Sequence, residues 1–339
     1  YSRAACPRSS LSTALDTMRL LSSFLISLLL LCWIASPQTG KPPANPAPGG
    51  DDVTFRADTR LVVLPISVAD KNGKLVTDLK QSAFKVYENG VEQPIKIFKR
   101  EDVPVSLGII IDNSGSMKEK RQKVEIASVD MVKASNPQDE VFIVNFNDEA
   151  WLDVPMTSDV KAMQEGVARI DSRGGTAMRD AISMSIDYLK KEGKRQKKVL
   201  LVITDGNDNA STMNLEKLVS RAQQNEVLLF AIGLLNEEER HEARIAKRAL
   251  DTIARDSGGL AFYPKGVSDV DQIALQVAHE IRNQYTLAYS PTVPQMDGSF
   301  RQIKVTVNGP GHPLVRTRAG YYATPDEPGK KTVSEKLAR

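Results

Sequence analysis

Asp112-Asn113-Ser114-Gly115-Ser116-Met117 directly follows the apolar run Val105-Ser106-Leu107-Gly108-Ile109-Ile110-Ile111. This run is short and rich in β-branched residues, which is typical of a buried parallel strand. Asp112, Ser114 and Ser116 stand at alternate positions, and alternate side chains of an extended chain point the same way. One carboxylate and two hydroxyls should therefore meet at the carboxyl end of the strand, where open α/β sheets bind ligands. Oxygen donors without nitrogen or sulfur favour a hard cation such as Mg²⁺.

Two later loops supply further oxygen atoms. Ser172-Arg173-Gly174-Gly175-Thr176 leads into a predicted helix, and the apolar run from Val199 to Thr204 leads into Asp205-Gly206. Thr176 and Asp205 both fall at the predicted edge of the sheet. The alternative is that the Ser/Gly stretch is only a turn, with Asp112 acting as a cap for the helix predicted from Glu119.

The order Asp-x-Ser-x-Ser, Gly-Gly-Thr and Thr-Asp-Gly resembles the metal-ion-dependent adhesion site of von Willebrand factor type A domains. The resemblance covers about Pro104 to Arg282. It implies Mg²⁺ as the metal, with Mn²⁺ or Ca²⁺ as alternatives, and a protein partner whose Asp or Glu completes the coordination. It also implies adhesion rather than catalysis, and it places five residues of this chain on the metal-coordinating positions: Asp112, Ser114, Ser116, Thr176 and Asp205.

The alternation of strands and helices predicts the fold class and the division into domains. Strands and helices alternate through 103–283, which predicts an α/β domain with a doubly wound, mostly parallel sheet flanked by helices. Only strands are predicted on either side, so we expect 53–102 and 284–325 to form the two parts of one smaller β-sandwich. In these flanks, Phe84 to Gly90 and Gly320 to Tyr322 are similar to segments of an exported bacterial subgroup of the family. The remaining segments are predicted as upstream residues plus a signal peptide (1–40), a Pro-rich linker (41–52) and a disordered tail (326–339).

The N-terminal region indicates export. Met18-Arg19 is followed by the apolar run from Leu20 to Ile34, which is the pattern of a secretory signal and is short for a membrane-spanning helix. A retained membrane anchor and a lipidated Cys32 both stay open as alternatives. If Met18 is the start, Cys6 lies upstream of it and Cys32 lies within the signal, so the exported protein carries no cysteine and no disulfide. We expect a periplasmic, secreted or cell-envelope protein.

Composition and motif content argue against two other classes of function. The net charge of +3 in 339 residues is too small to indicate nucleic-acid binding. An enzyme would need a positioned base, and none of the three histidines, His241, His279 and His312, adjoins the metal motifs. Asp148 and Asp208 lie in loops that could approach the site, and we expect them to be solvated. The alternatives to adhesion are an envelope scaffold whose metal only ties loops together and a metal-dependent hydrolase.

Overall fold

The computed structural model describes residues 61–100, 102–134, 136–167, 173–206, 208–235, 240–309 and 311–325. These residues all belong to one compact unit. The predicted signal peptide, the Pro-rich linker, both cysteines and the C-terminal tail lie outside the described residues. Within the described ranges, no helix is both long enough and apolar enough to cross a bilayer.

A six-stranded sheet lies at the centre of the α/β region. Its strands pair in parallel except for the edge strand β7, which runs antiparallel to β6. The sheet order is β10-β9-β8-β5-β6-β7, and the strands are β5 (Val105–Asp112), β6 (Glu140–Phe146), β7 (Ala150–Thr157), β8 (Lys197–Thr204), β9 (Val227–Gly233) and β10 (Ala261–Phe262).

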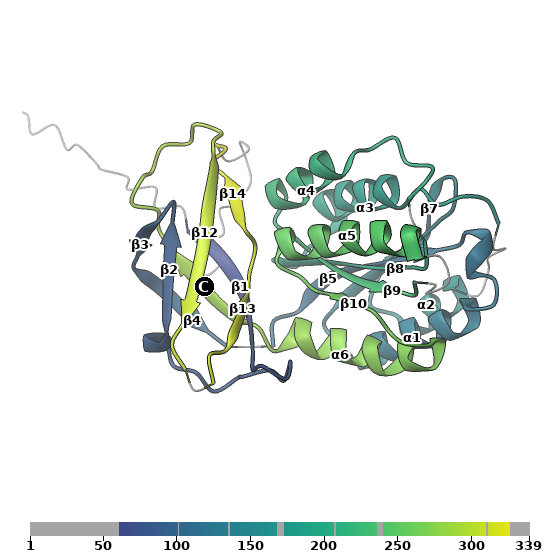
Figure 1. Ribbon diagram of the computed structural model, residues 1–339, viewed down its shortest axis with the longest axis horizontal. Coiled ribbons are helices and arrows are strands. Elements are labelled where there is room, and N and C mark those ends of the chain that lie inside the picture. The colour runs from purple at the N-terminus through teal and green to yellow at the C-terminus, as the bar shows by residue number, and fades with distance from the viewer. Residues whose placement is uncertain are drawn as a thin grey trace, which may run out of the picture. The chain divides into compact units, whose positions relative to one another are not determined.

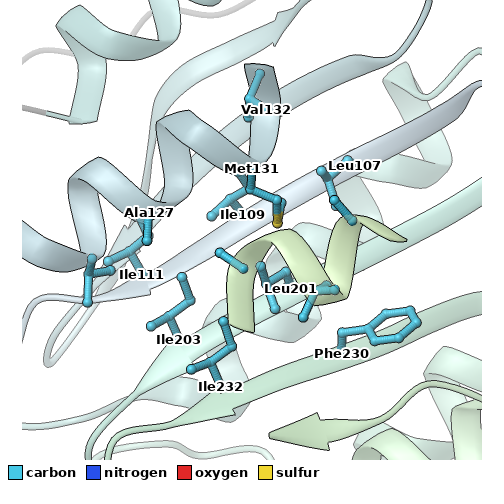
Figure 2. Close-up of a cluster of buried hydrophobic side chains, with 14 of the residues drawn as sticks. Leu107, Ile109, Ile111, Ala127, Met131, Val132, Leu201, Ile203, Phe230 and Ile232 are labelled. Atoms are coloured by element: carbon cyan, nitrogen blue, oxygen red, sulfur yellow. The ribbon is translucent and has the colours of Figure 1, made fainter. Parts of the chain in front are cut away.

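Helices cover both faces of this sheet (Figure 1). On one face, α1 (Arg121–Lys133), α2 (Val160–Val167) and α6 (Val270–Arg282) pack against the odd-numbered core positions of β5. Figure 2 shows these side chains, with Ile109 and Ile111 of the strand facing the helices. The other face is covered by α3 (Met178–Glu192), α4 (Leu215–Gln224) and α5 (Arg240–Ser257).

The central strand β5 is buried along its whole length, which explains its unbroken apolar sequence. Gly108 in its middle has a packing role, because a β-carbon there would lie 2.3 Å from the Phe142 ring and 2.5 Å from Leu200. The strand is therefore fixed tightly between its two neighbours. This rigidity holds Asp112, its last residue, at a defined position on the edge of the sheet.

Strands from before and after the α/β region combine into two antiparallel sheets, which share one apolar core. Phe98 and Val305, one from each half, both pack against this core. With the parallel sheet and its helices, this arrangement confirms the predicted fold class. One sheet has the order β13-β1-β11-β4, and its strands are β13 (Leu314–Arg316), β1 (Val62–Ala69), β11 (Tyr285–Tyr289) and β4 (Ile95–Lys99). The other sheet has the order β14-β12-β2-β3, and its strands are β14 (Gly320–Tyr322), β12 (Phe300–Val307), β2 (Phe84–Glu88) and β3 (Val91–Gln93).

Two details differ from the sequence interpretation. The pattern from Val315 to Tyr322 predicts one strand, but the chain forms β13 and β14, which belong to different sheets. The crossing segment between them contains Arg318, which is buried and donates to the carbonyl oxygen of Val63. The helix α4 was not predicted, although Asn214 caps it by accepting a hydrogen bond from the backbone of Lys217.

Candidate metal centre

The five predicted ligands lie in three loops at the carboxyl ends of the parallel strands. Asp112 ends β5, and Ser114 and Ser116 follow it in the loop that contains the short 3-10 helix η2 (Gly115–Met117). Asp205 directly follows β8, and Thr176 lies two residues before α3. The strands β5 and β8 are hydrogen-bonded neighbours, so their loops meet.

Asp112 is completely buried, and both of its carboxylate oxygens accept hydrogen bonds. Oδ1 accepts from the backbone N–H of Ser114 at 2.8 Å, and Oδ2 accepts from the hydroxyl of Thr204 at 2.5 Å. Burial raises the pKa of the Asp112 carboxyl to about 6; the bonds from Thr204 and Ser114 oppose this rise, and the charge of Asp205 adds to it. The helix-cap alternative is wrong, because the cap residue of α1 is Lys120 and no side chain caps that helix.

A row of polar atoms runs from Ser114 to Lys120. The hydroxyls of Ser114 and Ser116 are 3.2 Å apart, and Ser116 donates to Oδ1 of Asp205 at 2.8 Å. The other oxygen of Asp205, Oδ2, accepts from the ammonium of Lys120 at 2.5 Å. The Asp205 side chain is only 1% exposed, whereas Ser116 is an exposed residue. The row therefore starts inside the protein and opens to solvent at Ser116.

Thr176 lies beside this row and is held by backbone contacts. Its N–H donates to Oδ1 of Asn209 at 2.9 Å, and its carbonyl oxygen accepts from the backbone of Asn209 and of Ala210. Its hydroxyl oxygen is 3.8 Å from the position that a β-carbon on Gly206 would occupy. A bond from the N–H of Gly115 to the carbonyl of Gly174 connects the first two loops. The structure thus brings Thr176 next to the loop that carries Asp205.

Asp148 is exposed, as the sequence suggested, whereas the side chain of Asp208 is buried; both carboxylates also contact the loops around the site. Oδ1 of Asp148 accepts from the N–H of Gly175 at 2.8 Å. It packs so closely that a β-carbon on Gly174, which has a positive φ of 79°, would lie 2.2 Å from Oδ2. The side chain of Asp208 is 5% exposed and pairs with Arg179. Both carboxylates hold the loops that present the site, and their partners Gly175 and Arg179 are too distant in sequence to be recognised from it.

The chemistry of these side chains fits a divalent cation. Two carboxylates and neighbouring hydroxyls are hard oxygen donors of the kind that Mg²⁺ and Ca²⁺ take. The Asp205 carboxylate already binds one cationic group, because it forms an ion pair with the Lys120 ammonium. Within the described ranges no group of three or more His, Cys, Asp or Glu residues could hold a metal, so the hydroxyls would be essential members of this site.

Part of the chain is similar to known proteins. Residues 107–207 match the family model of the von Willebrand factor type A domain. Inter-alpha-trypsin inhibitor heavy chain H4 of Bos taurus is 24% identical over 174 residues, which is 47% of this chain and 18% of that protein. Integrin alpha-11 of Mus musculus is 31% identical over 104 residues, which is 29% of this chain and 9% of that protein. This chain therefore spans less than a fifth of the length of either relative.

Solved structures that are similar to this chain share little sequence identity with it. One such structure is proximal thread matrix protein 1 from the mussel byssus with a zinc-occupied MIDAS motif. It has a TM-score of 0.45 and 17% identity, and the match covers 57% of this chain and 49% of that one.

The matched region runs from inside β5 to just beyond β8, and it contains all five of the predicted ligands. In the structure, the same region supplies the central parallel strands and the loops at their carboxyl ends. The chain is therefore a protein that contains a von Willebrand factor type A domain.

Proposed function

We propose that this protein is an exported binding module that recognises a protein partner through Mg²⁺, with Mn²⁺ or Ca²⁺ as alternative ions. Asp112, Ser114, Ser116, Thr176 and Asp205 would hold the ion. The observation that carries the proposal is the hydrogen-bonded row Ser114–Ser116–Asp205 next to the buried Asp112. Hard oxygen donors converge there at one edge of a rigid sheet.

The exposure of the site supports binding of a macromolecule. Ser116 is exposed, so one side of the row is open to a partner. A hydroxyl carries no charge, and an ion held partly by hydroxyls keeps positive charge that an incoming carboxylate can neutralise. We therefore propose that an Asp or Glu of the partner completes the coordination shell. The signal-like segment from Leu20 to Ile34 supports a periplasmic, secreted or envelope location.

Replacing Asp112 by Asn tests the metal site without a change of shape. The amide keeps an oxygen for the Ser114 N–H and removes the charge. We expect Asp112→Asn to lose measurable Mg²⁺ binding in calorimetric titration. The metal-free variant should remain folded and gain up to about 3 kcal/mol at pH 7, because burial penalises the ionised carboxylate in the wild type.

Asp187→Asn is the matched control, because Asp187 is an exposed carboxylate of the same domain that pairs with Arg221. It should bind Mg²⁺ as the wild type does. Unchanged Mg²⁺ affinity in Asp112→Asn would contradict the proposed site.

Chelation separates the adhesion proposal from the scaffold alternative. We expect a pull-down from envelope extracts to lose the partner on addition of EDTA, while circular dichroism shows the protein still folded. Thr176→Ala should weaken partner binding more than Mg²⁺ binding if Thr176 coordinates only in the partner-bound state. If EDTA instead unfolds the protein, and partner binding is unchanged at EDTA concentrations that leave the protein folded, the scaffold alternative would be favoured.

A further inference from the structure

We propose that Lys120 is a built-in competitor of the metal ion, and that its ammonium must leave Asp205 before a divalent cation can bind. This inference rests on the proposed function of the site. Lys120 would then set the ion concentration at which the module becomes able to bind its partner. No feature of the Asp-x-Ser-x-Ser pattern itself predicts this role, since Lys120 lies outside it.

The ammonium of Lys120 lies where it must interfere with a bound cation. Its Nζ is 2.5 Å from Oδ2 of Asp205, and the side chain of Asp205 is 1% exposed. Oδ1 of the same carboxylate accepts from Ser116. Both oxygens of this proposed ligand are thus engaged, one by a predicted ligand and one by a positive charge. A divalent ion at Asp205 would lie within a few ångströms of that charge.

The side chain of Lys120 can move while its backbone stays in place. Its N–H donates to the carbonyl oxygen of Met117 at 3.0 Å, and its own carbonyl oxygen accepts from Val124 at 3.2 Å, which starts α1. These bonds fix the Cα atom. The side chain is 24% exposed and carries its charge on a flexible four-carbon stem. The ammonium can therefore swing into water without unfolding the helix.

The cost of this exchange lowers the affinity for metal. An opposite charge within about 4–6 Å typically changes the proton affinity of a carboxylate by about 10- to 1000-fold. A metal ion competes for the same carboxylate and, if Lys120 stays nearby, is also repelled by it. Removing the lysine charge should thus strengthen metal binding, whereas removing a ligand should weaken it. This opposite sign distinguishes a competitor from a supporting residue.

Calorimetric titration of Mg²⁺, and of Mn²⁺ as a second probe, tests the proposal on the full chain. We expect Lys120→Met to bind about tenfold tighter than wild type or better. Lys120→Arg keeps the charge and should stay within about threefold of wild type. Lys118→Met is the control for net charge, because Lys118 is exposed and lies two residues earlier; it should also stay within about threefold.

The outcomes separate this inference from the function on which it rests. Tighter binding by Lys120→Met alone supports the competitor. Equal or weaker binding by Lys120→Met, with the wild type still binding, overturns the competitor and leaves the metal site standing. Absence of binding in both proteins at millimolar Mg²⁺ overturns both proposals.

A second measurement uses the unmodified protein and so does not depend on how a variant folds. Trace acetylation with mass spectrometry reports how accessible each lysine amine is. We expect Lys120 to be acetylated at least about threefold faster with saturating Mg²⁺ than without it, because the ion frees the ammonium from Asp205. The rate at Lys118 should not change. An equal rate at Lys120 in both conditions would overturn the competitor.

Discussion

The sequence predicts which residues are candidate ligands, but it does not predict the residues that hold them in place. Alternation along an extended chain predicts that Asp112, Ser114 and Ser116 point the same way. In the structure the Ser114 and Ser116 hydroxyls are 3.2 Å apart, but Ser116 lies in the 3-10 helix η2 and not in an extended segment. The supporting residues could not be identified in this way. Thr204 donates to Asp112 across 92 positions of sequence, and nothing in the local pattern marks that bond. Residue type and spacing identify candidate ligands, whereas the side chains that orient them depend on the folded chain.

Asp208 is the clearest supporting residue. Its carboxylate accepts from the backbone and guanidinium of Arg179 and from the backbone and hydroxyl of Ser211, at 2.7 to 3.1 Å. The amide of Asn offers one acceptor oxygen, so several of these donors would lose their partner. We predict that Asp208→Asn lowers the free energy of unfolding by about 2–3 kcal/mol, measured by urea denaturation.

The exposed pair of Asp187 with Arg221 provides the comparison for Asp208. Asp187 is 65% exposed, and Asp187→Asn should change the free energy of unfolding by less than about 0.5 kcal/mol. Equal effects of the two substitutions would show that Asp208 does not hold these loops.

At the scale of elements, the strongly periodic segments are found from the sequence and the weakly marked ones are not. The buried strands β5, β8 and β9 are unbroken apolar runs, and the helix α6 repeats apolar residues at helical spacing. In α4 only Leu218, Ala222 and Gln223 are buried, so its apolar stripe is narrow and polar residues hide it. Alternation also cannot assign a strand to a sheet, which is why the separation of β13 from β14 was missed.

The junction between β8 and α6 should make stability depend on pH. Lys197 begins β8, and its ammonium donates to the carbonyl oxygen of Ile281 in α6. Burial lowers the pKa of Lys197 from 10.5 to about 7, although the charges of Asp102 and Asp139 act in the opposite direction. Between about pH 7 and pH 10 the unfolded chain therefore binds more protons than the folded protein. The free energy of unfolding should rise with pH in this window.

Urea denaturation from pH 7 to pH 9.5 measures this rise. In the wild type, we predict that Lys197 contributes a rise in the free energy of unfolding of less than about 1.4 kcal/mol per pH unit. Lys197→Met should remove this contribution to the slope. Lys191→Met is the control, since the Lys191 side chain is 82% exposed, and it should keep the wild-type slope. A slope in Lys197→Met equal to that of the wild type would contradict the assignment.

For the whole molecule, the connections between the two regions lie away from the candidate site. The chain enters the α/β region at the amino end of β5 and leaves it after α6, whose Ile281 contacts the amino end of β8. The candidate ligands lie at the carboxyl ends of these strands. Polar contacts also join the two regions: Arg316 pairs with Glu280, and Arg318 pairs with Glu226. The connections and ion pairs between the two regions therefore do not involve the loops that carry the candidate ligands.

We propose that 103–283 is an inserted domain and that 53–102 and 284–325 depend on each other. The α/β region has its own apolar clusters on both faces of its sheet, whereas the sandwich core takes Val86 from one flank and Ile303 from the other. We predict that the fragment 103–283 folds alone, with a cooperative thermal transition, and binds Mg²⁺ within about threefold of the whole chain. The fragment 284–325 alone should show no cooperative transition, because its strands lack the partners that β1 and β2 supply. A fragment 103–283 that stays unfolded while the whole chain folds would show that the sandwich is part of the domain's own core.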